Sequence, residues 1–135
     1  MEKELKVIIE SDIFRHYGNG KKQFLWKIRN TALYCTIIFR KAHYYSTKKS
    51  ILGKLKEIYY RYCLNKVSRR YLFQIPYCVN IGKGLNIVHF GRIIIAPTVI
   101  IGENCNIFTG VTIGSTVRGN RGGGTYNREQ CLDWT

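Results

Sequence analysis

The chain of 135 residues has few acidic side chains: 8 Asp and Glu stand against 22 Lys and Arg, a formal net charge of +14. It has no apolar run near the ~20 residues that a membrane-spanning helix needs, and no N-terminal secretion signal. The five cysteines form no Cys-x-x-Cys pair, which argues against a zinc site and a disulfide framework. We therefore expect a cytoplasmic globular protein with reduced thiols and no bound metal.

Positive charge is concentrated in the first half of the chain. Residues 1–75 hold 17 Lys and Arg against 5 Asp and Glu, whereas residues 76–135 hold 5 against 3. Such a half can meet nucleic acid, anionic lipid or an acidic partner, or it can be the solvated surface of helices whose aromatic side chains face a core. No glycine-aromatic signature of an RNA-binding domain is present, so nucleic acid is the weakest option.

The pattern of residues 1–72 predicts helices. A charged segment from Glu2 to His16 ends at a Gly-Asn-Gly turn signal. Apolar residues then recur at steps of three and four from Phe24 to Leu33, the spacing of one helical face, and Thr31 to Phe39 is nearly all apolar. A third helix is marked by apolar residues on one face, which we expect to meet the core: Ile51, Leu55, Ile58, Tyr59 and Tyr62.

The second half follows a six-residue repeat in which every hexad begins with isoleucine and has an apolar or small fifth residue. A period of six suits neither a helix nor simple strand alternation. It predicts a solenoid of short strands and corners with the first residue of each hexad inward, rather than an Ile-rich antiparallel domain. The register slips by two residues between the third and fourth hexads. The first residues are Ile75, Ile81, Ile87, Ile95, Ile101, Ile107 and Ile113.

From about Glu10 to about Gly123 the sequence resembles the serine O-acetyltransferases of the left-handed parallel β-helix superfamily, especially short forms found with bacterial surface-glycan genes. The resemblance is carried by Ser-Asp-Ile-Phe-Arg in the first helix, His-Phe-Gly-Arg from His89, and Gly-Val-Thr-Ile-Gly up to Gly114. It implies an α + β solenoid: a basic helical region at 1–72 followed by a short β-helix at 73–124. The implied activity is acetyl transfer from acetyl-CoA to serine, as in cysteine biosynthesis. A sugar hydroxyl of a surface polysaccharide is the alternative acceptor.

His89 is the candidate catalytic residue. It lies where the register slips, so the chain must bulge there, and a side chain on a bulge can leave the interior and face a cleft. Acetyl transfer to an alcohol needs a base for the hydroxyl proton, and imidazole titrates near neutral pH. The matching family histidine is the general base. A histidine with a purely structural role is the alternative.

Four further site residues are assigned by the resemblance. Asp12 aligns with an N-terminal family acid and Arg121 with a family arginine, so both are expected to bind the substrate. Arg121 would pair with the carboxylate of the substrate. For Arg121 a flexible basic loop is an equal alternative. Gly114 and Thr116 are expected near the pantetheine arm of acetyl-CoA. The resemblance also implies a homotrimer or a dimer of trimers.

The chain departs from the family pattern in three places. Val88 stands where an acid usually precedes the histidine, so the group that orients His89 must come from elsewhere. Arg121 is not followed by the family's second histidine. Arg15-His16-Tyr17 replaces an Arg-Asp-Pro signature, which loosens the assignment of serine as the acceptor.

Residues 125–135 break the repeat. With a suitable choice of codons, a one-base shift in this segment reads Pro-Thr-Ile-Gly-Asn-Asn-Val-Trp-Ile-Gly, which continues the hexads. We therefore expect a chain truncated by a frameshift, with an aberrant tail at 125–135. An inactive remnant that survives only as an oligomeric scaffold is then the alternative to an enzyme.

Overall fold

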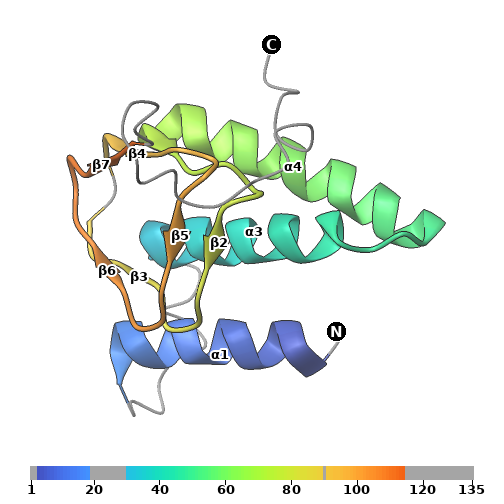
Figure 1. Cartoon of the computed structure of the whole chain (residues 1–135), viewed down its shortest axis with the longest axis horizontal. Coiled ribbons are helices and arrows are strands. Elements are labelled where there is room, and N and C mark those ends of the chain that lie inside the picture. Colours follow the sequence, from blue (N-terminus) through green and yellow to red (C-terminus); the bar gives the residue numbers. More distant parts are fainter. Residues whose placement is uncertain (1–2, 19–29, 90, 115–135) are drawn as a thin grey trace, which may run out of the picture.

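The computed structural model describes residues 3–18, 30–89 and 91–114. Its helices are α1 (Lys3–Tyr17), α3 (Thr31–Ser46) and α4 (Ile51–Tyr71). Helix α3 lies between α1 and α4 and packs against both (Figure 1). None of the helices in the described ranges is long and apolar enough to cross a membrane.

Capping side chains set the helix boundaries. The Asn30 side chain accepts a hydrogen bond from the Leu33 amide at 3.1 Å, and Ser50 does the same for the Gly53 amide at 3.1 Å. Helix α4 ends where Leu72 adopts a left-handed conformation, with φ of 52°. The predicted start of the second helix near Phe24 falls on residues that the structure does not describe.

The chain then forms short parallel strands that wind into a coil. The strands pair in three sheets, in the orders β1-β4-β7, β2-β5 and β3-β6, which form the faces of the coil (Figure 1). Helix α4 packs on β1, and α1 and α3 contact β3. The strands are β1 (Phe73–Gln74), β2 (Asn80–Ile81), β3 (Asn86–Ile87), β4 (Ile93–Ile95), β5 (Ile100–Ile101), β6 (Asn106–Ile107) and β7 (Thr112–Ile113).

The pairing register locates the two-residue slip. Ile87 pairs with Ile107, twenty positions later, whereas Ile95 pairs with Ile113, eighteen positions later. A coil of three hexads takes eighteen residues, so the first coil contains two extra residues, and they lie in the corner between β3 and β4. The predicted solenoid and its bulge are both confirmed.

The interior of the coil is built from the repeat. The first residue of each hexad points inward, and it is buried at Ile75, Ile81, Ile87, Ile95 and Ile107. These side chains join a core that continues into α3 and α4. A second, smaller core lies between α1 and α3 and contains Leu5, Ile9, Ile13, Leu33 and Tyr44.

The predicted buried face of the third helix is wrong. Ile51, Leu55, Ile58, Tyr59 and Tyr62 are between 61% and 82% exposed. The opposite side of α4 packs inward instead, through Gly53, Glu57, Leu64 and Val67. Glu57 is tolerated there because Lys54 and Arg61 lie 2.9 Å and 3.6 Å from its carboxylate oxygens.

Candidate active site

His89 lies in the lengthened corner between β3 and β4, and its side chain is exposed. The equivalent corner between β6 and β7 is two residues shorter. The extra length brings this histidine out of the row of inward side chains. The exposure that the slip predicts is therefore present. His89 is not among the described residues that line a cavity, and its role stays a prediction.

The corner is held by its backbone. Gly91 and Arg92 have φ of 124° and 50°, both in the region that favours glycine. The Gly91 carbonyl accepts hydrogen bonds from the Thr109 hydroxyl at 2.7 Å and from the Gly110 amide at 3.1 Å. These two bonds tie Gly91, two residues after His89, to the second coil.

A cavity of about 1170 Å³ opens beside this corner, between the C-terminal half of α4 and the β1-β4-β7 sheet. Arg92 reaches it from the His89 corner, and Arg69 reaches it from α4. Gln74 and Thr112 add polar groups from the sheet. None of the described residues that line the cavity is acidic, so it favours an anionic group.

The orienting partner of His89 is not found within the described ranges. No carboxylate there pairs with this imidazole, and the preceding Val88 is half-buried. The source of an orienting group for His89 stays a prediction.

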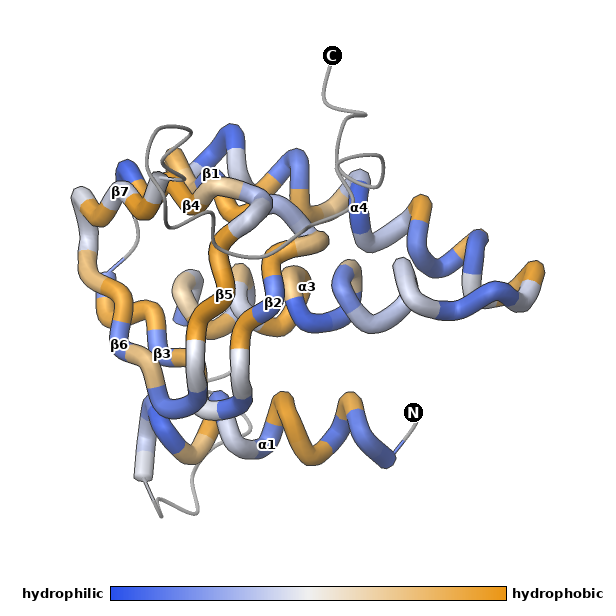
Figure 2. Tube along the Cα trace, in the orientation of Figure 1, coloured by the Kyte–Doolittle hydropathy of each residue, from blue (hydrophilic) through white to orange (hydrophobic). Residues whose placement is uncertain are grey.

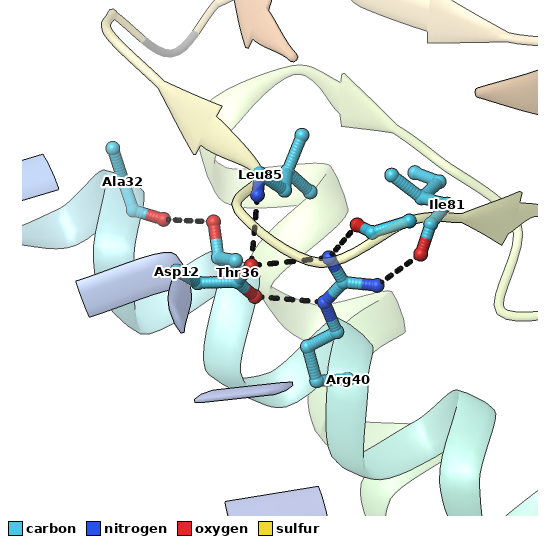
Figure 3. A network of polar contacts seen from close by, with 7 residues as sticks. Asp12, Ala32, Thr36, Arg40, Ile81 and Leu85 are labelled. Atoms are coloured by element: carbon cyan, nitrogen blue, oxygen red, sulfur yellow. Dashed lines mark hydrogen bonds and ion pairs between the residues drawn. The ribbon is translucent and has the colours of Figure 1, made fainter. Parts of the chain in front are cut away.

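Asp12, the predicted substrate-binding acid, lies in a buried polar network. Its Oδ2 accepts from Arg40 Nε at 2.7 Å, and its Oδ1 accepts from Arg40 Nη2 at 3.1 Å and from the Leu85 amide at 2.8 Å (Figure 3). Arg40 also donates to the carbonyls of Ile81 and Gly82. Asp12 is 0% exposed, so these bonds would have to break before an acceptor reached it. Its substrate role remains a prediction.

Arg40 is the partner of Asp12 that the sequence pattern did not reveal. It follows the nearly all-apolar segment Thr31–Phe39 and shares the buried face of α3 with Thr36. A lone cation on such a face signals a buried acid elsewhere, because an unpaired charge in a core is costly. The signal does not say which of the acids pairs with it.

The other two histidines have structural contacts. His16 Nδ1 lies 2.6 Å from Asn86 Oδ1, and its Nε2 lies 2.7 Å from Asn30 Nδ2, so it joins α1, the cap of α3 and strand β3. His43 Nδ1 donates to the Tyr77 carbonyl at 2.8 Å. Burial lowers the pKa of His43; the bond to Tyr77 raises it and the charge of Arg40 lowers it further.

The remaining predicted site residues are at or beyond the end of the described coil. Gly114 follows β7 and is exposed. Thr116 and Arg121 lie outside the residues that the structure describes, as does the predicted tail at 125–135. Their assignments to acetyl-CoA and substrate stay predictions.

No protein-family model matches the sequence, and no curated protein shows a significant sequence match. The fold itself defines a class: a helical region followed by a left-handed parallel β-helix. Among solved structures, serine acetyltransferases have this architecture, so the predicted fold is confirmed and the observed fold is consistent with the resemblance.

Three of these structures illustrate the match. A serine acetyltransferase in complex with CoA aligns with a TM-score of 0.59 and 20% identity, covering 81% of this chain and 46% of its own. Serine acetyltransferase 1 of Entamoeba histolytica, in complex with L-cysteine, aligns with a TM-score of 0.61 and 25% identity, covering 93% of this chain and 45% of its own. The soybean serine acetyltransferase complexed with serine aligns with a TM-score of 0.63 and 18% identity, covering 87% of this chain and 47% of its own. The chain thus spans less than half the length of these proteins.

Proposed function

We propose that the protein is an acetyl-CoA-dependent O-acetyltransferase of the serine acetyltransferase type. The observation that carries the proposal is the two-residue insertion at whose corner His89 is exposed, in a fold that serine acetyltransferases share. The solved structures of this fold include complexes with CoA and with serine, which supports a thioester donor and a small hydroxyl acceptor.

In the proposed reaction the hydroxyl oxygen of the acceptor attacks the thioester carbonyl of acetyl-CoA while His89 accepts the proton of that hydroxyl. The tetrahedral adduct then collapses, the carbon–sulfur bond breaks, and the imidazolium returns the proton to the departing thiolate. The products are an acetyl ester and CoA with a free thiol. A positioned base typically contributes about 10²–10⁴-fold to such a step.

Arg92 is proposed to meet the anionic part of a substrate. It comes from the same corner as His89 and lines a cavity with no described acid. Arginine binds carboxylate and phosphate in a bidentate manner. Serine and CoA both carry such groups, and separate KM values for the two substrates distinguish them: an Arg92→Ala variant should raise only the KM of the substrate it holds.

A sugar hydroxyl is the second candidate acceptor. The observation that favours it is the burial of Asp12 against Arg40, which leaves the aligned acid without a free oxygen for serine. A sugar acceptor has no ammonium group and does not need this acid.

The test is release of CoA thiol from acetyl-CoA, with serine and with sugar acceptors in parallel. His89→Ala should lower kcat on the order of a hundredfold or more with little change in KM for acetyl-CoA. Thr98→Ala, at another exposed position of the coil, is the matched control and should leave both constants unchanged. A protein that releases no thiol with any acceptor would support the inactive scaffold instead.

We also propose that the protein assembles as a homotrimer or a dimer of trimers. Exposed apolar side chains on the outer faces of the coil support this: Ile94 and Ile100 are 44% and 69% exposed. Light scattering across micromolar concentrations tests it, and a monomer throughout would contradict it.

A further inference from the structure

Helix α4 presents an exposed apolar stripe. Residues 51, 52, 55, 58, 59 and 62 fall on one side of an α-helix, opposite the side that packs on α3. Hydrophobic residues recur along this helix in Figure 2. The stripe consists of Ile51 (82% exposed), Leu52 (71%), Leu55 (61%), Ile58 (64%), Tyr59 (61%) and Tyr62 (67%). So many large apolar side chains on one exposed face mark a contact surface.

The charges around the stripe are positive. Helical geometry places Lys54 and Lys56 on its two sides, and Lys66 and Arg69 continue its line toward the C-terminus of α4. Glu57 is the only acid of the helix, and it lies on the buried side, paired with Lys54 and Arg61. The face therefore has lysines and arginines but no carboxylate of its own.

These charges decide between occupants. A second copy of α4 laid on the first would bring two cationic faces together, which is unfavourable. An anionic lipid surface neutralises the cations and also accepts the apolar side chains. Lysines beside the stripe can keep their ammonium groups among the lipid headgroups while the methylene groups of their side chains lie along the apolar surface.

We propose that α4 binds an anionic lipid surface, lying parallel to it with this stripe inserted. The helix has 21 residues, about 31 Å at 1.5 Å per residue, and the side opposite the stripe packs on the rest of the protein, so it lies on the bilayer and does not cross it. Along the helix the four aliphatic residues of the stripe are followed by its two tyrosines, and this combination matches the boundary between acyl chains and headgroups. The inference is independent of the proposed acetyltransferase activity.

The test is co-sedimentation of the full chain with large vesicles of phosphatidylcholine, alone or mixed with phosphatidylglycerol. We expect binding to the mixed vesicles only, weakening at least about tenfold as salt rises from roughly 0.1 M to 0.5 M. Leu55→Asp and Tyr59→Ser should each weaken binding about tenfold or more. The matched control is Val7→Asp, at an exposed apolar position of α1, which should bind as the parent does.

Charge is tested separately by Lys66→Glu, which should weaken binding, with Lys66→Arg retaining it. Equal binding to neutral vesicles, or parental binding by both stripe variants, would overturn the proposal. The proposal would also be overturned if, without lipid, light scattering gave Leu55→Asp a smaller mass than the parent, because the stripe would then be an interface between copies of the chain. Binding to soluble polyglutamate but not to vesicles would identify an acidic protein surface and would also overturn it.

Discussion

At the scale of single residues, the buried pair of Asp12 and Arg40 joins three parts of the molecule. Asp12 comes from α1 and Arg40 from α3, and their remaining polar atoms bond to backbone groups of Ile81, Gly82 and Leu85 in the first coil. Burying two charges costs free energy, and geometry of this quality is needed to recover it. The network therefore specifies how the helices dock more than it adds net stability.

Breaking one side of this pair should be far more costly than removing both. Arg40→Met leaves a buried carboxylate without a counter-ion, so we expect the free energy of unfolding to fall by about 3–5 kcal/mol in urea titrations. Asp12→Leu combined with Arg40→Met should lose much less than the sum of the single changes.

The exposed pair of Lys83 and Glu103, 3.6 Å apart, is the control, and Lys83→Met should cost at most about 1 kcal/mol. Equal losses for Arg40→Met and Lys83→Met would show that the burial of the Asp12 pair has no energetic consequence.

The lowered pKa of His43 makes stability depend on pH. Burial disfavours its charged form, so below the ordinary histidine pKa of about 6.5 the unfolded chain takes up the proton first. Stability should therefore fall as pH drops from roughly 7.5 to 5.5, and level off only below the folded pKa. His43→Gln, which keeps a donor for the Tyr77 carbonyl, should flatten this part of the profile in urea unfolding. An unchanged slope would assign the effect to another group.

At the scale of elements, the coil is held by close stacking of backbone at its corners. A Cβ placed on Gly82 would lie 2.7 Å from Gly102 C and from the Glu103 amide nitrogen, both backbone atoms of the next coil. One placed on Gly102, at the same position of its own hexad, would meet no atom of the described residues within 4 Å. Glycine is therefore required for packing at the first position but not at the second.

Gly82→Ala should lower the free energy of unfolding by about 1–3 kcal/mol, because the backbone of the second coil must move. Gly102→Ala is the matched control. It should be neutral, or stabilising by about 0.4–1 kcal/mol through the lower entropy of the unfolded chain. Thermal or urea unfolding measures both. Equal losses for the two variants would contradict the stacking that the structure places at Gly82.

The strands of the coil, each of which pairs with a strand one coil away, were predictable from the sequence. The isoleucine repeat predicts the inward positions, and the slip before Ile95 predicts the corner that carries His89. The face of α4 was not predictable, because both of its sides carry apolar residues and the choice depends on α3. The ion pair was likewise hidden, since Asp12 and Arg40 are brought together by packing that no local pattern encodes.

At the scale of the whole molecule, burial decreases from the helices outward along the coil. In the first coil Ile75, Ile81 and Ile87 are at most 6% exposed. In the second, Ile95 and Ile107 remain enclosed but Ile101 is only partly buried, as is Ile113 at the start of a third coil. The described helices pack on strands of the first coil, and α1 reaches the second through exposed hydrogen bonds from Arg15 to Asn104 and Asn106. The second coil therefore depends largely on the first for its stability.

This gradient predicts unequal costs at matched positions twenty residues apart. Ile81→Ala should cost about 2–5 kcal/mol in urea unfolding, as is usual for a fully buried aliphatic side chain, and Ile101→Ala clearly less. Amide hydrogen exchange should show the same order, with β5 and β6 exchanging before β2 and β3.

Since Thr109 and Gly110 of the second coil hold the Gly91 carbonyl, early opening there would also release the corner that carries His89. A subunit packed on the second coil would protect this corner, so exchange at β5 and β6 should slow as the protein concentration rises. Exchange that is uniform along the coil and independent of concentration would contradict both the gradient and its link to assembly.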